Sequence, residues 1–317
     1  MRVIRVREFG PPDVLKVDDA PEPQPGAGEV VVAVEAAGVI YGDVIIRSGG
    51  YPFPLPYVPG LEVGGRVVDV GPDADRGLLG QRVVATTPGS SGGYAELARA
   101  ATADLHTVPD GLSVQQAVAV FQAGGLAVGL LAAMRVAPGE TVLITAAAGR
   151  IGSLLVQLAK SAGATVVAAA GGPVKTAAAR ALGADLALDY TRPGWAERVG
   201  GADVVLDAVG GDIGGQALTA ARGGSGRFGF YGFTSGAWTH VDPVAVASRG
   251  LTVVGAAGIA FAQPPAAQRA ATATALAAAA AGELAVTIHA TRPLPEAAAA
   301  HTALAARATL GATLLTP

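Results

Sequence analysis

The sequence predicts an α/β protein with a β-rich first part followed by a doubly wound parallel sheet. Short apolar runs separated by Pro and Gly clusters fill the first 110 residues, and a strand, glycine turn, helix and strand follow one another over residues 141–170. Further buried strands that end in glycine occur after residue 200. Strands that alternate with helix-length segments favour a parallel sheet covered by helices. With 317 residues the chain is long enough for two domains.

The first part has the strand spacing of a small barrel-like domain. Its candidate strands are residues 3–7, 14–18, 29–36, 65–70, 82–86 and 95–98. Ser113 can cap a helix over 114–123, and a second helix is expected over 126–134. After residue 262 the pattern predicts a helix over 264–282, a strand over 285–290, a helix over 295–307 and a strand over 312–315. We expect these closing strands to return to the first domain.

The segment 141–170 has the pattern of a βαβ unit that binds a dinucleotide. Residues 141–145 form an apolar, β-branched run, which is typical of a strand buried on both faces. The turn that follows contains Gly149 and Gly152, with Ala147 in the place of the first glycine of the usual pattern. Such a turn directs backbone N–H groups and a helix N-terminus at a pyrophosphate. A turn that only packs a helix on a strand would have the same pattern.

The residues after the second strand of this unit bear on the ribose of the cofactor. In folds that select NAD, an Asp or Glu ends this strand and binds the 2′-hydroxyl. Here the strand 164–170 ends in alanine, Gly171 and Gly172 follow, and Lys175 and Arg180 come next. A cation at this place favours a 2′-phosphate and therefore NADPH. The alternative is that both cations are solvated charges on a helix.

Composition excludes several classes of site. The chain has no cysteine, which rules out disulfides, cysteine-ligated zinc, iron–sulfur clusters and thiol nucleophiles. A net charge of −3 argues against a nucleic-acid surface. The N-terminus lacks the apolar core of a signal peptide, and polar residues interrupt the alanine run around 277–281, so neither predicts a membrane segment. We therefore expect a cytoplasmic protein.

Several short motifs resemble one family in their order and spacing. They are residues 38–43, 47–49, 57–65, 92–96, 146–152, 205–210 and 294–301. Over nearly its whole length the chain resembles the zinc-independent quinone oxidoreductases (zeta-crystallin-like) of the medium-chain dehydrogenase/reductase superfamily. The resemblance implies a GroES-like catalytic domain of residues 1–112 and 283–317, interrupted by a Rossmann NADPH-binding domain of residues 113–282. It also implies a dimer or a tetramer, and we expect a homodimer.

The positions that hold zinc in related dehydrogenases carry no ligand here. Zinc-dependent relatives have a Cys within the segment that corresponds to 38–43, and a His where this chain has Leu61. The histidines are scattered without ligand spacing, at His106, His240, His289 and His301, and we expect each to be a surface or structural residue. We therefore expect no metal. Without a Lewis acid, alcohol oxidation is disfavoured, and the expected reaction is hydride transfer to a quinone or other conjugated carbonyl acceptor.

The resemblance implies a cofactor site made of the glycine turn, a cation and three strand ends. The turn would approach the pyrophosphate, Lys175 and Tyr190 the 2′-phosphate, and the segment 230–232 the nicotinamide. Arg150, where relatives commonly have Gly, would add a charge contact or point to solvent. The full set is Ala148, Gly149, Arg150, Ile151, Gly152, Gly171, Lys175, Tyr190, Phe230, Tyr231 and Gly232.

The expected substrate pocket is less polar than in relatives. Ile40 replaces a frequent Asn, Ile45 a Tyr, and Leu126 a Thr that commonly faces the cofactor. This indicates a hydrophobic small-molecule substrate that is bulkier than a simple quinone. We expect it to be aromatic or conjugated. Tyr41 and Tyr51 are the candidate catalytic residues, because a tyrosine there would stack on an aromatic acceptor or protonate an enolate. Packing of the loop is the alternative role for each.

Three functions remain open at this point. The first is an NADPH-dependent quinone reductase. The second is an enoyl or enone reductase acting on a polyketide-like intermediate of secondary metabolism, which requires a proton to be placed on carbon. The third is a protein that binds NADPH without catalysis, as the crystallin relatives illustrate. A placed acid such as Tyr41 or Tyr51 favours the second, and an open site without one favours the first.

Overall fold

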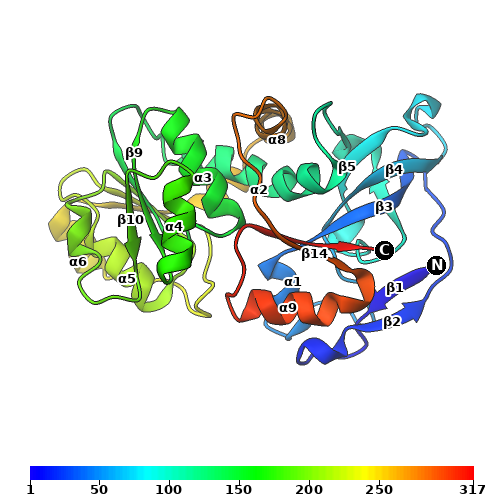
Figure 1. Ribbon diagram of the computed structural model, residues 1–317, viewed down its shortest axis with the longest axis horizontal. Helices are drawn as coiled ribbons and strands as arrows, with labels where there is room; N and C mark the ends of the chain where they lie inside the picture. Colours follow the sequence, from blue (N-terminus) through cyan, green and yellow to red (C-terminus); the bar gives the residue numbers. More distant parts are fainter. The chain divides into compact units, whose positions relative to one another are not determined.

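The computed structural model describes residues 1–317, which form two compact units (Figure 1). The first unit comprises Met1–Gln122, Ala279–Ala281 and Val286–Pro317. The second unit comprises Ala123–Ala278 and Gly282–Ala285. The boundary between them falls inside helix α2 (Val114–Ala133). The domain limits 113 and 282 given above remain predictions, because a compact unit is defined by its contacts and a domain by its ability to fold alone.

The second unit is built on a six-stranded sheet in the order β10-β9-β8-β11-β12-β13. Every neighbouring pair is parallel, and the strand order reverses between β8 and β11. This confirms the doubly wound parallel sheet, in which ligands bind at the carboxyl ends of the strands beside the reversal. The strands are β8 (Thr141–Ile144), β9 (Thr165–Ala170), β10 (Leu186–Asp189), β11 (Val204–Asp207), β12 (Arg227–Phe230) and β13 (Thr252–Gly255).

Helices cover this sheet, which is why its central strands are apolar without alternation. One core cluster contains Leu143 of β8, Val205 of β11 and Phe228 of β12, and all three side chains are fully buried. The helices of the unit are α3 (Arg150–Ser161), α4 (Pro173–Ala181), α5 (Gly211–Thr219), α6 (Pro243–Arg249), α7 (Ala256–Phe261) and α8 (Pro265–Ala280). Strand β10 was not expected from the sequence, because its four residues lack the β-branched side chains typical of strands.

The first unit is organised around the long strand β3 (Glu29–Val39). β3 pairs with β4 along one edge, and with β6 and β15 along the other, all antiparallel. The closing strands β14 and β15 therefore return to the first sheet, as expected. The other strands are β1 (Arg2–Arg5), β2 (Lys16–Asp19), β4 (Glu62–Val70), β5 (Arg82–Thr86), β6 (Leu97–Ala101), β7 (His106–Thr107), β14 (Ile288–Pro293) and β15 (Ala312–Thr316). The α-helices that lie wholly within the unit are α1 (Tyr41–Arg47) and α9 (Ala297–Ala305), and α2 begins in it.

Helix α2 is continuous, so the prediction of two helices over 114–123 and 126–134 was wrong. The expected break lay at Gly124 and Gly125, and each glycine costs a helix about 1 kcal/mol relative to alanine. Packing overrides this cost, because a Cβ at Gly125 would lie 2.3 Å from Oγ1 of Thr272 in α8. By length and composition α2 is apolar enough to cross a membrane, but half of its most apolar stretch is buried, as in a core helix.

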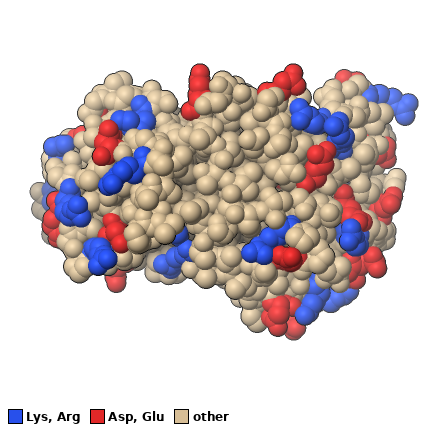
Figure 2. Space-filling view, viewed as in Figure 1, with Lys and Arg blue, Asp and Glu red and all other residues tan.

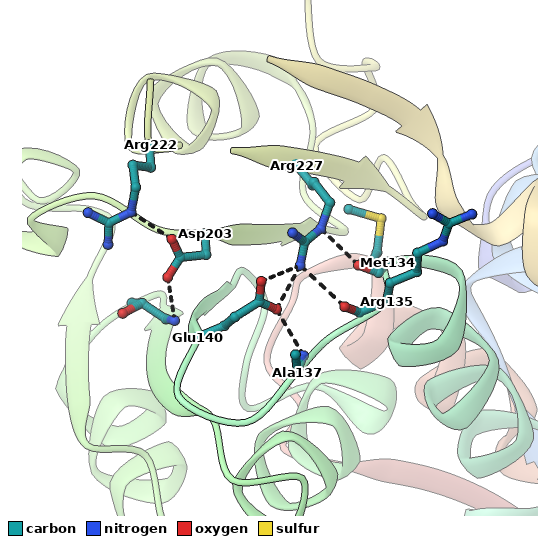
Figure 3. Close-up of polar contacts among 8 residues, drawn as sticks. Met134, Arg135, Ala137, Glu140, Asp203, Arg222 and Arg227 are labelled. Carbon is teal, nitrogen blue, oxygen red and sulfur yellow. Dashed lines mark hydrogen bonds and ion pairs between the residues drawn. The ribbon is translucent and has the colours of Figure 1, made fainter. Parts of the chain in front are cut away.

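Charged pairs tie the strands together at the amino edge of the second sheet (Figure 3). Arg227, at the start of β12, donates to the Met134 carbonyl beyond the end of α2 at 2.9 Å and to the Glu140 carboxylate at 2.7 Å. Asp203 accepts from Arg222 at 2.6 Å. Arg227 thus satisfies a carbonyl that the end of a helix leaves unpaired. These contacts lie at the edge opposite the carboxyl ends of the strands, where folds of this type bind their ligands.

Substituting Arg227 tests this role. Arg227→Met removes the donors for the Met134 carbonyl and for a Glu140 side chain that is 22% exposed, and the expected loss of stability is about 1–3 kcal/mol. Arg222→Met is the matched control at the same edge. Its side chain is 47% exposed, so its loss should be below about 1 kcal/mol. Urea unfolding measures both, and equal losses would contradict the assignment.

Candidate functional site

The turn between β8 and α3 leaves no room for a side chain at Gly152. A Cβ there would lie 2.3 Å from the Ala146 carbonyl oxygen and 2.8 Å from Cα of Ala147. Glycine therefore allows the first turn of α3 to pack directly on the turn that leaves β8. Gly149 is the N-cap of α3, and no side chain caps the helix. Backbone N–H groups at the N-terminus of α3 are thus directed toward the carboxyl edge, where an anion would be stabilised.

The residues expected to contact a pyrophosphate all belong to this turn. Ala148 is buried, Gly149 begins the helix, and Arg150 and Ile151 are half-buried in its first turn. The turn lies beside the reversal of strand order. The turn therefore lies where a fold of this type binds a dinucleotide phosphate, and contact of these residues with a phosphate remains a prediction.

The expected ribose-binding residues come from two neighbouring strands. Gly171 follows β9, and Tyr190 follows β10 and donates its backbone N–H to the Ala170 carbonyl at 3.1 Å. A Cβ at Gly171 would lie 3.1 Å from the Tyr190 ring, so this glycine makes room for the tyrosine. Lys175 is half-buried in the first turn of α4. The structure thus brings Gly171 and Tyr190 together, with Lys175 on the helix that follows Gly171.

Sequence reasoning missed Asp189, which lies at the same place. Its Oδ1 accepts from the Gly172 backbone N–H at 2.9 Å and from the Thr191 hydroxyl at 2.7 Å. The hydrogen bond from Gly172 holds the pKa of this carboxyl below its usual value. In the usual pattern the acid ends the second strand, which is β9 here, whereas Asp189 ends β10. Pairing of Asp189 with Ala170 in the sheet decides its position.

A second buried carboxylate, Asp207, fixes the centre of the carboxyl edge. It is fully buried at the end of β11 and accepts from the hydroxyls of Thr145 at 2.6 Å and Thr239 at 2.7 Å. It also accepts the backbone N–H of Gly210 at 3.0 Å. Asp207 therefore joins β8, β11 and the loop before α6 at the reversal of strand order. The sequence marked this segment only as a buried strand that ends in glycine.

The segment after β12 continues the sheet toward this edge. The Tyr231 backbone N–H donates to the Asp207 carbonyl at 2.7 Å. The Tyr231 hydroxyl oxygen is buried without a hydrogen-bond partner, and burial raises its pKa. Phe230 packs edge-on against Trp238, with ring centroids 5.5 Å apart. Gly232 approaches the Ala208 carbonyl, which a Cβ would meet at 3.0 Å. These residues lie at the expected strand end, and their contact with a nicotinamide remains a prediction.

The candidate catalytic tyrosines lie in the first unit. Tyr41 is the first residue of α1 and is half-buried, whereas Tyr51 follows α1 and is 60% exposed. Tyr57 is buried, and burial raises its pKa to about 12, which makes it a poor acid at neutral pH. Its ring packs on Phe53 with centroids 4.8 Å apart, which fits loop packing. Catalytic roles for Tyr41 and Tyr51 remain predictions.

A chain of buried titratable groups holds α1 in place. The Tyr94 hydroxyl lies 3.0 Å from Oδ2 of Asp43 and 3.1 Å from Nε2 of His301 in α9. Asp43 also accepts the backbone N–H of Ile40 at 3.1 Å, and so fixes the start of the helix at Tyr41. Burial raises the pKa of Asp43 to about 7 and lowers that of His301 to about 3. His301, expected to be a surface or structural residue, is fully buried.

Metal-binding side chains do not gather anywhere in the structure. No three His, Asp or Glu side chains are grouped so that they could hold a metal ion. The segment that begins α1 carries Ile40, and the start of β4 follows Leu61. Neither side chain offers a ligand atom.

Asp43 and His301 should oppose each other in the pH dependence of stability. The pKa of Asp43 rises from 3.8 to about 7 on folding, so its contribution is complete below pH 3.8 and is lost as pH rises through about 7. The pKa of His301 falls from 6.5 to about 3, so its contribution is present above pH 6.5 and is lost as pH falls through about 3. Between pH 3.8 and pH 6.5 the two groups change the free energy of unfolding with pH in opposite directions, so their effects cancel in the unmodified protein.

Single substitutions should expose the separate slopes. For Asp43→Asn we expect the free energy of unfolding to rise with pH from about 4 to 6.5, with a slope of up to about 1.4 kcal/mol per pH unit. For His301→Gln we expect it to fall with pH from about 4 to 7. Urea unfolding across this range measures both. Flat profiles in both variants would show that neither group changes protonation on folding.

The chain matches two domain families. Residues 26–110 match the alcohol dehydrogenase GroES-like domain, and residues 151–287 match the zinc-binding dehydrogenase family. The first range lies within the unit organised around β3. The second covers α3 and the strands from β9 to β13, which include most of the parallel sheet.

Full-length relatives are quinone oxidoreductases. The quinone oxidoreductase of Pseudomonas aeruginosa is 34% identical over 323 aligned positions, which cover 99% of both chains. The Escherichia coli quinone oxidoreductase complexed with NADPH superposes with a TM-score of 0.92 at 29% identity and full coverage of both chains. A mycobacterial protein complexed with NADPH gives a TM-score of 0.92 at 33% identity, again over the full length of both. The chain therefore belongs to the quinone oxidoreductase family of the medium-chain dehydrogenase/reductase superfamily.

Proposed function

We propose that this protein transfers hydride from NADPH to a quinone or another conjugated carbonyl acceptor, without a metal. The observation that carries the proposal is the uncapped N-terminus of α3, held against the turn after β8 by the absence of a side chain at Gly152. That turn lies beside the reversal of strand order. Relatives over the full length are quinone oxidoreductases, and similar structures were solved with NADPH.

The residues present fit this cofactor. The backbone N–H groups at the start of α3 bind the pyrophosphate, with the Arg150 guanidinium as an added charge. Lys175 and Tyr190 hold the 2′-phosphate, beside the space that Gly171 leaves open. Phe230, Tyr231 and Gly232 orient the nicotinamide end. When bound, NADPH supplies the hydride, and the protein's task is to position the reacting groups.

The acceptor must be electron-poor. Leu61 offers no ligand atom and the chain has no cysteine, so no residue set of this chain provides the Lewis acid that alcohol oxidation needs. A quinone or an enone already carries the electron deficiency within its conjugated system. Tyr41, fixed at the start of α1 by Asp43, and the exposed Tyr51 are the proposed donors of the proton that follows the hydride.

Apolar side chains favour a second candidate, an enoyl or enone reductase acting on a polyketide-like intermediate. Ile40, Ile45 and Leu126 are all half-buried, so their apolar atoms remain partly accessible. Such side chains accommodate a hydrophobic substrate better than a small polar quinone. In this reaction a proton donor such as Tyr41 or Tyr51 is required, because a proton must be placed on carbon.

We also propose a cytoplasmic homodimer that binds neither nucleic acid nor membrane. Strand β13 ends the parallel sheet, and its outer edge pairs with no strand of this chain. Phe261, six residues beyond β13, is 58% exposed. An unpaired edge with an apolar neighbour supports pairing with a second copy. Charges of both signs are interspersed on the face shown in Figure 2, which offers no extended basic surface for nucleic acid.

A panel of acceptors tests the proposed reaction. NADPH oxidation is followed with benzoquinone, phenanthrenequinone, α,β-unsaturated ketones and α,β-unsaturated thioesters, each with and without a chelator. Fast turnover of quinones supports the first candidate, and turnover of enones with weak quinone activity supports the second. We expect no effect of the chelator, and loss of activity on chelation would contradict the metal-free reaction. NADPH binding with no turnover of any acceptor would contradict both enzymatic candidates.

Replacing Lys175 tests the cofactor assignment. Lys175→Ala removes the proposed partner of the 2′-phosphate, so we expect the Kd for NADPH to rise about 10-fold to 100-fold, the equivalent of one charge-assisted hydrogen bond. The Kd for NADH should stay unchanged. Arg180→Ala is the control, since Arg180 is exposed in the last turn of the same helix. Equal effects of Lys175→Ala on both dinucleotides would contradict the 2′-phosphate assignment.

A further inference from the structure

Asp189 places a carboxylate at the N-terminus of α4, beside the proposed ribose site. Its Oδ1 accepts three hydrogen bonds, from the N–H of Gly172 at 2.9 Å, the N–H of Thr191 at 3.0 Å and the Thr191 hydroxyl at 2.7 Å. Oδ2 has a single charged neighbour, Nε of Arg192, at 3.8 Å. That distance is too long for a hydrogen bond. The second oxygen therefore keeps its capacity to accept one.

This carboxylate stands where an acid from the preceding strand would otherwise lie. In folds of this type an acid after the second strand accepts the ribose 2′-hydroxyl. Here β9 ends in Ala170, and sheet pairing places Asp189 directly opposite it. The bond to Gly172 then brings the carboxylate to the turn between β9 and α4. The third strand of the sheet thus supplies a group that the second strand lacks.

Two opposite charges consequently flank the proposed 2′ position. Lys175, in the first turn of α4, attracts a 2′-phosphate, whereas Asp189 repels it. The Asp189 side chain is 17% exposed, so solvent screens its charge only in part. Arg192 compensates weakly, because its side chain is 77% exposed and 3.8 Å away.

We propose that Asp189 is a specificity-determining residue of the cofactor site, and that it accepts a hydrogen bond from the ribose 2′-hydroxyl of NADH and opposes the 2′-phosphate of NADPH. The protein then binds both dinucleotides, and the balance between Lys175 and Asp189 sets its preference for NADPH. This inference rests on the proposed function, since it concerns the same cofactor site.

A purely structural role would need only Oδ1. That oxygen anchors Gly172 and Thr191, and an asparagine carbonyl would keep the same three contacts as weaker, neutral hydrogen bonds. Oδ2 and its share of the negative charge make no hydrogen bond within the turn. They are the features that distinguish a ribose hydroxyl from a phosphate.

Asp189→Asn separates the two roles. The substitution keeps an acceptor for Gly172 and Thr191, and it replaces the charged Oδ2 with a neutral NH₂ donor. We expect the Kd for NADPH to fall and the Kd for NADH to rise, so that the ratio of the two changes by roughly tenfold. Titrations at low and high salt measure both constants, and the change for NADPH should be smaller at high salt. Unfolding in urea checks that the variant remains folded, and Asp189→Ser is the second variant if it does not.

The same strand offers a matched control. Asp185, at the amino end of β10, also accepts a backbone N–H, from Val166 at 2.7 Å, and pairs with Lys160 at 2.9 Å. Hydrogen bonding likewise holds its pKa below the usual value. Asp185→Asn removes the same charge from the opposite edge of the sheet and should leave the Kd ratio unchanged.

The outcomes separate this inference from the proposed function. An unchanged ratio in Asp189→Asn overturns the specificity role, as does an equal change in Asp185→Asn, which would indicate a general effect of net charge. A wild-type protein that binds neither NADPH nor NADH overturns the proposed function itself. A shifted ratio in Asp189→Asn alone supports the proposal.

Discussion

The close approach of α3 to the turn after β8 is the constraint on which the second unit depends. At Gly152 a single added carbon would meet backbone atoms at 2.3 Å and 2.8 Å, and backbone cannot move aside as a flexible side chain can. The helix N-terminus therefore lies against the strand end and points its N–H groups outward. The packing of the helix and the proposed phosphate site both depend on one missing side chain.

The two edges of the parallel sheet use polar groups differently. At the amino edge, Arg227 donates to the Met134 carbonyl beyond the end of α2 and to the Glu140 carboxylate. It thereby links α2 to the strands of the sheet. At the carboxyl edge, Asp207 and Asp189 accept backbone N–H groups of the glycine-rich turns that follow the strands. Glycine turns have no side chains to hold them, and these carboxylates take over that task. Hydrogen bonds to these carboxylates thus hold the turns at the edge where we propose that the cofactor binds.

Most of the fold can be predicted from the pattern of apolar strands and the spacing of the glycines. Residues 141–170 predict β8, α3 and β9 because a buried parallel strand is recognisable from a few apolar, β-branched residues. The prediction failed where tertiary contacts override local preference. Helix α2 continues through Gly125, where the absence of a side chain lets Thr272 of α8 pack closely against the helix. Strand β10 exists because β9 offers it a hydrogen-bonding edge, although its own residues favour no strand.

The doubly wound sheet, the glycine turn and the absence of cysteine ligands can all be recognised in the amino-acid sequence, because periodicity and composition are local properties of a chain. Which side chains meet, in contrast, becomes clear only from the folded chain. Asp43, Tyr94 and His301 are far apart in sequence and form one buried chain of hydrogen bonds. Asp189 reaches Gly172 across a strand pairing that no local pattern encodes. Sites are built from contacts distant in sequence, and those depend on the register and packing of the whole fold.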